Sequence, residues 1–439
     1  MDINIIIGIL LMISFVGFIV YCIRGYNLMI GVTIIALVWT FLPLIGNYFS
    51  PNQIMENLSV TEVITIVFQS APENWGNILV NILWGAWFGR VLLETGIAST
   101  LIKRTIELGG SNPVITMILL NIATAIMFTS MTGAGPVIAI AVIVIPILLS
   151  LGIPKTVALF TFMGSVMAGL FLNIVNFNQY YAFFAGTNGF ESYSYQEYFP
   201  FALLASVISL VIVSIAASLL LNSKKITYHW GVSSSLKDNE VPGIALIVPI
   251  LPVVGVIGFS LPVIFGFMVS GFFALWVCKK LKNGFKDACI IINKLFTDGA
   301  VDTAPLMGFL LCLAAFNTSA NFVAPYFQVL LGGIVPSTQL GIFILFIVLV
   351  PLGYFRGPMN LVGSGAATLA VITAVTNLPI SYLFPFFAIT TIVMQHFDIT
   401  QSWIAWGMGY AKVDAKEYIK IAYPIGWLIA VILCIVAFI

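Results

Sequence analysis

The chain of 439 residues is 61% hydrophobic and 8% charged, and its mean hydropathy of +1.11 excludes a soluble domain. A net charge of +1 excludes a polyanionic partner such as nucleic acid. The five cysteines are scattered along apolar runs without a C-x-x-C spacing, which predicts neither disulfides nor a metal site.

Apolar runs in chain order predict an all-α polytopic membrane protein, and no cofactor-binding motif accompanies them. The first half, 1–222, contains runs near 4–22, 26–45, 77–98, 113–130, 134–151, 156–175 and 200–221. A polar cytoplasmic linker is expected over 223–242. The second half, 243–439, contains runs near 243–259, 261–278, 300–318, 339–353, 362–377, 380–394 and 421–438.

The basic residues predict how these runs enter the membrane. Of the 17 Lys and Arg residues, all except Arg90 and Arg356 fall in connections that can be cytoplasmic when both termini are outside. This agreement requires that 113–151 and 339–377 each enter and leave the membrane on the same side. Both ranges are therefore predicted to be re-entrant hairpins of a multi-pass protein in a bacterial cytoplasmic (inner) membrane.

The two halves repeat the same order of parts. Gly-Ala-Gly at 133–135 corresponds to Gly-Ser-Gly at 363–365, and Asn-Phe-Asn at 176–178 corresponds to His-Phe-Asp at 396–398. Since the first half starts outside and the second half starts inside, the repeats are predicted to be inverted. Inverted repeats with broken helices are the usual architecture of secondary transporters, and the binding site lies where the interruptions meet.

Four interruptions are predicted to converge on one substrate site: the two hairpin tips and two helix breaks, around 173–179 and 395–402. Broken helices present unpaired N–H groups and a positive dipole end, which suit a carboxylate. Arg356 lies within apolar sequence and can hold that carboxylate with a bidentate fork. The alternative role of each hydroxyl or amide is a hydrogen bond between helices. The predicted substrate-binding residues are Ser130, Thr132, Gly133, Gly135, Asn176, Asn178, Arg356, Asn360, Gly363, Ser364, Gly365, Thr368 and Thr400, with Asn173, Gln179 and Ser402 beside them.

Three ionisable residues are the candidates for proton or ion coupling. His396 and Asp398 are two residues apart, so that on unwound backbone both can face one cavity, which an intact helix would forbid. Histidine titrates near neutral pH. Glu94 is the third candidate, although it lies one helical turn after Arg90 and we expect these two to pair on one helix face.

Two further charged features receive structural interpretations. Asp298 and Asp302 precede an apolar run that contains Pro305, which favours roles at the start of a helix. The segments 99–110 and 282–297 are amphipathic and cationic, and we expect them to lie along the cytoplasmic interface.

Three blocks resemble the gluconate permease family: GAWFGRVLLETG at 85–96, GSGAAT at 363–368 and HFDITQSW at 396–403. The resemblance implies the ion transporter superfamily fold, a homodimer with scaffold and transport domains, an elevator mechanism, and proton-coupled import of a gluconate-like hydroxy acid. The chain departs from the family in two places. Arg356 lies farther from the glycine-serine tip, and the first tip, 132–136, lacks acidic and aromatic residues. A dicarboxylate, another hydroxy acid or an amino acid therefore stays open as the substrate.

Proton-coupled symport of a small organic anion is the first hypothesis, with sodium-coupled transport of a di- or tricarboxylate or an amino acid as the alternative. A cation/proton antiporter is disfavoured because the fixed charge of Arg356 repels a cation. A channel is disfavoured because two hairpins and broken helices suit alternating access better. An enzyme is not expected, because the second histidine, His229, lies in the polar linker and no H-E-x-x-H pattern occurs.

Overall fold

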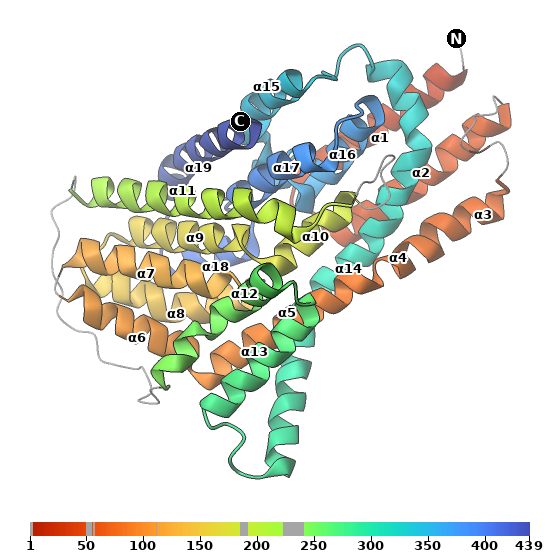
Figure 1. Ribbon diagram of the computed structural model, residues 1–439. Helices are drawn as coiled ribbons and strands as arrows, with labels where there is room; N and C mark the ends of the chain where they lie inside the picture. Colours follow the sequence, from red (N-terminus) through yellow and green to blue (C-terminus); the bar gives the residue numbers. More distant parts are fainter. Residues whose placement is uncertain (1–2, 50–54, 56–57, 111, 185–191, 223–240) are drawn as a thin grey trace.

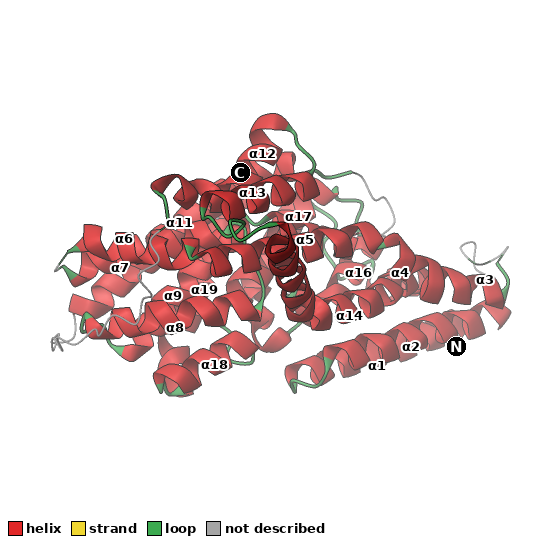
Figure 2. Ribbon diagram, turned by 90° about the horizontal axis from the view of Figure 1, so that it is seen from below, coloured by secondary structure: helices red, strands yellow, loops and turns green. Residues whose placement is uncertain are grey.

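The computed structural model describes residues 3–49, 55, 58–110, 112–184, 192–222 and 241–439. Every regular element in these ranges is a helix, as Figures 1 and 2 show. An apolar helix satisfies its backbone hydrogen bonds within one segment, which a lipid environment requires. The prediction of an all-α polytopic membrane protein is confirmed.

The elements of the first half begin with two apolar helices and continue through a nearly unbroken helical run. They are α1 (Ile3–Ile23), α2 (Leu28–Phe49), α3 (Val60–Thr65), the π-helix η1 (Ile66–Ser70), α4 (Ala71–Asn74), α5 (Gly76–Thr95), α6 (Ile97–Gly109), α7 (Pro113–Phe128), α8 (Ala134–Ser150), α9 (Lys155–Phe171), α10 (Ile174–Phe184) and α11 (Tyr195–Asn222).

The elements of the second half include one helix of 47 residues, α14, and two short irregular helices inside the second hairpin. They are η2 (Gly243–Ile250), α12 (Leu251–Phe259), α13 (Val263–Val277), α14 (Phe285–Leu331), α15 (Gln339–Leu349), η3 (Val350–Arg356), η4 (Leu361–Gly365), α16 (Ala366–Val375), α17 (Ile380–Gln395), α18 (Ser402–Ala411) and α19 (Ala415–Phe438).

The described helices provide several membrane spans. Seven of them are long and apolar enough to cross a membrane, or eight if the pair α9–α10, bent by 68°, forms one span. Large apolar side chains stay exposed along α1, α2 and α11, among them Ile13, Phe41 and Ile215. A continuous apolar surface of this kind is unfavourable in water, and lipid covers it in a multi-pass membrane protein.

The helices pack in two groups (Figure 1). In the scaffold group, α1–α5 and α12–α14, the long helix α14 packs against α2 and α5, and α13 packs against α5. In the hairpin group, α6–α11 and α15–α19, α9 packs against α7 and α11, and α17 packs against α19. The two groups meet where α16 packs along α14 and where α5 contacts α6, α8 and α10.

Both ranges predicted to be re-entrant hairpins contain a pair of short helices, and their entry and exit on one side of the membrane stays a prediction. The first pair, α7 and α8, is joined at 129–133, and the second pair, α15 and α16, is joined through η3, 357–360 and η4. Each hairpin is followed by an interrupted pair, α9–α10 in the first half and α17–α18 in the second. The order of elements therefore repeats along the chain, while the inversion of the repeats and the domain bounds 1–222, 223–242 and 243–439 stay predictions.

Two predicted boundaries are wrong. The run near 77–98 is the end of a helical stretch that starts at Val60, and the segment 282–297 is the first part of α14 instead of a separate interfacial helix. The first proline of α14 is Pro305, so no proline interrupts the helix between the cationic segment and the apolar one. Asp298 and Asp302 consequently lie in the interior of α14 and not at its start.

The membrane orientation leads to a labelling prediction. If the termini are outside, a cysteine placed at Asn188 should react with a membrane-impermeant maleimide added to intact cells, and one at Ser234 should not. Both positions lie outside the described residues. Labelling from the same side at both positions would contradict the inverted repeat, because that repeat depends on the charge asymmetry of the connections.

Candidate functional site

The two hairpin tips and the two helix breaks meet around one cavity of about 360 Å³. The scaffold group contributes a smaller share of the wall, from α2 and α14. The convergence expected from the sequence is therefore present in the structure. The lining residues are Leu28, Phe128, Thr132, Gly133, Ala134, Val137, Leu170, Asn176, Gln179, Tyr180, Asp302, Thr303, Pro305, Leu306, Arg356, Val362, Gln395, His396, Gln401, Ser402 and Trp403.

The first hairpin tip and the first helix break are connected by hydrogen bonds. The Thr132 hydroxyl donates to Asn176 Oδ1 at 2.8 Å, and both residues line the cavity. Gly133, with φ of +92°, ends the tip and precedes α8 in a backbone conformation that favours glycine. Since Gly133 has no side chain, no hydroxyl or carboxylate caps the first N–H groups of α8.

Asn173 lies behind this wall as a structural residue. Its Oδ1 accepts hydrogen bonds from the N–H groups of Val175 and Asn176, and its Nδ2 donates to the carbonyls of Phe128 and Met131, each at 2.9–3.1 Å. These four bonds cap α10 and attach it to the first hairpin. The N-terminus of α10 is therefore already satisfied and is not available to a substrate.

The second hairpin tip is held by close backbone packing. A Cβ atom on Gly363 would lie 2.2 Å from the Arg356 carbonyl oxygen, and one on Gly365 would lie 2.4 Å from the Asn360 backbone. Asn360 Oδ1 accepts from Val362 N–H at 3.0 Å, and the Ser364 hydroxyl donates to Arg356 O at 3.3 Å. Of these predicted substrate ligands, none lines the cavity; they shape the loop that carries Arg356.

Arg356 follows Phe355 in a left-handed turn, with φ of +57° at Phe355 and +56° at Arg356. Such backbone is costly for residues other than glycine and occurs where surrounding contacts enforce it. The buried carboxylate of Asp398 accepts the Arg356 backbone N–H at 3.2 Å. It also accepts the N–H and hydroxyl of Thr400 at 2.9 and 2.8 Å. Asp398 therefore positions the arginine.

His396 and Asp398 occupy different places. His396 lines the cavity, and its ring stacks on Trp403 with centroids 5.6 Å apart. Its Nδ1 lies 2.7 Å from the Ile392 carbonyl oxygen, an acceptor, so Nδ1 carries the proton and Nε2 is the other ring nitrogen. Asp398 is fully buried and is not among the lining residues. The expectation that both side chains face one cavity is wrong, because the turn at 396–398 points the aspartate toward Thr400 and the second hairpin.

Three residues that line the cavity each have a buried hydrogen-bond donor for which the described part of the chain provides no acceptor. They are Arg356 Nε, Gln401 Nε2 and Trp403 Nε1, all buried. Gln401 is the residue before α18, and its side chain does not cap that helix. The N–H groups of the first turn of α18 therefore have no side-chain acceptor either. A buried donor without an acceptor is unfavourable, and three around one cavity indicate a ligand that supplies acceptors.

One residue of the scaffold part of the wall, Asp302, belongs to an ion pair. Arg90 on α5 donates from Nε and Nη2 to the two carboxylate oxygens of Asp302 on α14, each at 2.5 Å. The expected pairing of Arg90 with Glu94 is wrong; Glu94 is exposed and lies 3.8 Å from Lys280. Glu94 does not line the cavity, so the structure gives no support for its role in ion coupling.

The remaining predicted ligands lie outside the cavity wall. The Ser130 hydroxyl donates to the Pro249 carbonyl. Asn178 and Thr368 do not line the cavity, although Asn178 Nδ2 and Thr368 Oγ1 are buried without a partner. Gly135 lies in the first turn of α8, where an added Cβ would be 3.1 Å from the Asp302 carboxylate. In the described part of the chain, no group of three or more His, Cys, Asp or Glu residues is placed to hold a metal ion.

Several lining residues were not among the predicted ligands: Tyr180, Asp302, Gln395, Gln401 and Trp403. The sequence contains a reason to expect an acidic residue such as Asp302 in this region. Arg90 is one of two basic residues inside apolar sequence, and an arginine in such sequence favours a carboxylate partner. The glutamines stood beside His396 and Asp398, but the sequence does not show which side of an interrupted helix faces inward.

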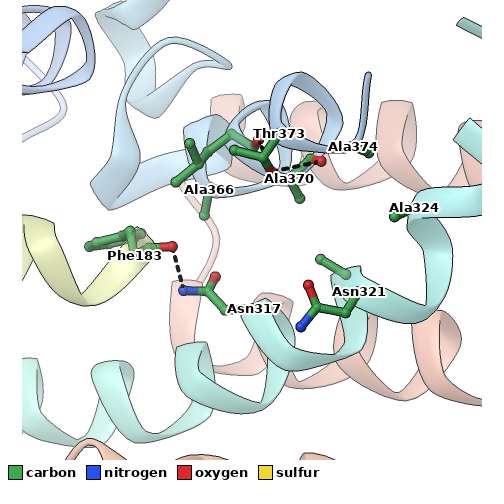
Figure 3. A pocket seen from close by; sticks show the side chains of 10 residues that line it. Phe183, Asn317, Asn321, Ala324, Ala366, Ala370, Thr373 and Ala374 are labelled. Atoms are coloured by element: carbon green, nitrogen blue, oxygen red, sulfur yellow. Dashed lines mark hydrogen bonds between the residues drawn. The ribbon is translucent and has the colours of Figure 1, made fainter. Parts of the chain in front are cut away.

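A second, much smaller cavity lies between α14 and α16, with a volume of about 10 Å³, room for one water molecule (Figure 3). Alanines from both helices line it, Ala320 and Ala324 facing α16 and Ala366, Ala370 and Ala374 facing α14. Asn317 Nδ2 donates to the Phe183 carbonyl at 3.1 Å at its edge, linking α14 to α10. The second hairpin thus contacts the scaffold group through small side chains.

Helical hairpins, an interrupted helix and a central cavity define a polytopic membrane protein with the fold of a membrane transporter. The solved structure of the YdaH transporter of Alcanivorax borkumensis, described as having an unusual topology, matches the chain with a TM-score of 0.67. The match covers 94% of this chain and 98% of that chain at 11% sequence identity. At this identity the likeness establishes the fold alone.

No protein-family model matches the chain, and no curated protein sequence matches it. The resemblance to the gluconate permease family is therefore not confirmed. The blocks at 85–96 and 363–368 correspond to places where helices pack closely, at Gly85 against Val175 and at Gly363 against Arg356. Close packing of this kind requires glycine in proteins with different substrates.

Proposed function

We propose that the protein is a secondary active transporter of a small organic anion, coupled to protons and operating by an elevator-type movement of the hairpin group. The observation that carries this proposal is the set of three partnerless donors, Arg356 Nε, Gln401 Nε2 and Trp403 Nε1, around one cavity. A carboxylate bound near the N-terminus of α18 is the acceptor that we propose for these donors and for the first N–H groups of that helix.

The rest of the wall supports a small organic body behind the anionic group. Leu28, Val137, Leu170 and Leu306 are apolar, and amides from Asn176 and Gln179 lie among them. An apolar lining with a few polar groups is typical of small-molecule sites. Further polar side chains, among them Thr132, Gln395 and Ser402, also line the wall, so a hydroxylated carboxylate can find hydrogen-bonding partners there.

His396 is the proposed proton carrier, because it lines the cavity and its Nε2 is not the nitrogen bonded to Ile392. Asp398 supports the site indirectly, because its carboxylate accepts the backbone N–H of Arg356 and so holds the arginine in place. Sodium coupling is the alternative. Transport of a di- or tricarboxylate or an amino acid is the alternative substrate class, and a cation/proton antiporter remains disfavoured by the arginine. A homodimer is likewise part of the proposal.

Ligand-dependent thermal stabilisation tests the substrate class. Purified protein in detergent is heated with each member of a panel of carboxylates and with alkylammonium salts as controls. A ligand that binds the folded state raises the midpoint of unfolding by mass action, and at 100 times Kd it contributes about 2.7 kcal/mol. We expect carboxylates and not alkylammonium ions to stabilise. Stabilisation by cations alone would contradict the proposal.

A further inference from the structure

The cavity has two helix N-termini without a side-chain cap, those of α8 and α18. Residues at both, Gly133 and Ala134 on one and Ser402 and Trp403 on the other, line the cavity. Each N-terminus carries roughly half a positive charge and suits one anionic group. The two helix N-termini differ in the charged and polar groups that lie beside them.

At α18, the neighbouring groups are donors that have no acceptor, including Gln401 Nε2 on a side chain that is 6% exposed. This N-terminus is the one at which the proposed substrate carboxylate binds. The inference below about Asp302 rests on that proposed function.

At α8, a carboxylate is already present. The position of a Cβ on Gly135 would be 3.1 Å from Cγ and from both carboxylate oxygens of Asp302, so the acid lies directly against the first turn. Scaffold helix α5 lies on the same tip, since a Cβ on Gly89 would be 3.9 Å from Met131 and Pro136. The tip of the first hairpin therefore packs against Asp302 of α14 and against α5.

Arg90 is also occupied, because its fork binds both oxygens of Asp302. The positive groups on this side of the cavity, the guanidinium and the α8 N-terminus, are thus shared by a single fixed carboxylate. A second anionic group on a substrate would meet Asp302 at short range in a site of low dielectric, where like charges repel strongly.

We propose that Asp302 is a specificity-determining residue that acts as a built-in anion at the N-terminus of α8, so that the cavity accepts monoanions and rejects dianions. The positive charge of Arg90 neutralises that of Asp302, so a substrate with one negative charge is not repelled from the cavity. Removing the charge of Asp302 frees the Arg90 fork and the helix N-terminus together. Asp302→Asn should then admit a substrate with two carboxylates.

The first experiment compares matched acids in thermal stabilisation: butyrate with succinate, and hexanoate with adipate. We expect the monoanions to stabilise the unsubstituted protein and the dianions to do so at least tenfold less effectively. In Asp302→Asn the dianions should gain at least tenfold in apparent affinity. Glu94→Gln is the matched control, because it removes a scaffold carboxylate paired outside the cavity, and it should leave the preference unchanged.

The second experiment measures the charge of the cavity without any substrate. Leu306, one turn after Asp302 and in the cavity wall, is replaced by cysteine in a protein whose five cysteines are removed. The thiol is modified with an anionic (ethylsulfonate) and a cationic (trimethylammonium) methanethiosulfonate. Asp302→Asn should raise the ratio of anionic to cationic rate about tenfold and Arg90→Gln should lower it. The double variant should return near the starting ratio.

The outcomes separate the two proposals. If no carboxylate stabilises the protein, the proposed function fails, while the modification rates still test the charge at Asp302. If carboxylates bind but dianions bind the unsubstituted protein as well as monoanions, the specificity role is overturned. Equal rate ratios in Asp302→Asn and the unsubstituted protein would also overturn it, because the charge of Asp302 would then have no effect inside the cavity.

Discussion

Replacing Arg356 by lysine should lower kcat/KM for uptake by about 100-fold. The partnerless Nε and the Nη2 that reaches the Thr400 carbonyl at 3.4 Å belong to one planar fork. A lysine ammonium replaces the charge but not two fixed donors, and a hydrogen bond to a charged group contributes about 1.5–3 kcal/mol. Initial rates of radiolabelled substrate uptake into proteoliposomes measure the effect.

The control for this variant is Arg104→Lys on α6, where the guanidinium makes a solvent-exposed pair with Glu107 at 3.4 Å. Exposed pairs contribute little, so uptake should stay within about twofold of the unsubstituted protein. Near-normal uptake by Arg356→Lys would show that the guanidinium does not bind the substrate and would restrict its role to the packing of the second hairpin.

Asp398→Asn should lower accumulation and exchange of substrate together, because it weakens the positioning of Arg356 and leaves the proposed proton carrier, His396, in place. The carboxylate accepts three hydrogen bonds, from Arg356 N–H and from the N–H and hydroxyl of Thr400. The amide retains acceptor capacity on one oxygen only and removes the charge behind Arg356. Accumulation against a gradient and counterflow, measured on the same proteoliposomes, separate coupling from binding.

His396→Gln belongs to the same test and should flatten the pH dependence of uptake, because glutamine does not titrate. Asp287→Asn in the first turn of α14 is the matched control for the aspartate variant, since Asp287 is exposed and remote in sequence from both hairpins. If His396→Gln accumulates substrate with an unchanged pH profile, the coupling group lies elsewhere. Asp302 then becomes the next candidate in place of Glu94.

The hairpin tips and the turns that follow the hairpins could be predicted from the sequence because their causes are local. Glycine at 133 and 363 and proline at 154 and 379 act on the backbone within a few residues. The charge asymmetry of the connections then required the apolar runs on either side of each tip to return to the same face. These signals need no knowledge of tertiary contacts.

The site was less predictable because contacts between distant residues decide it. Asn360 and Ser364 looked like ligands, but their side chains bond to the hairpin's own backbone. Asp302 looked like a helix start, but nothing ends the preceding helix, and an arginine 212 residues away binds it. Which of several polar residues faces a cavity depends on the rotation of each helix, and short apolar helices carry almost no amphipathic signal.

The length of α14 links two contacts that lie far apart. Asp302 touches the first hairpin, and Ala320 and Ala324 touch the second. At 1.5 Å per residue these points are about 27 Å apart on one rod. The second contact is made by alanines together with a hydrogen bond from Gln328 Nε2 to the Ala374 carbonyl, whereas at the first the Asp302 carboxylate lies against the first turn of α8. In the elevator movement that we propose, displacing the hairpins along α14 would therefore break different kinds of contact at the two ends of this helix.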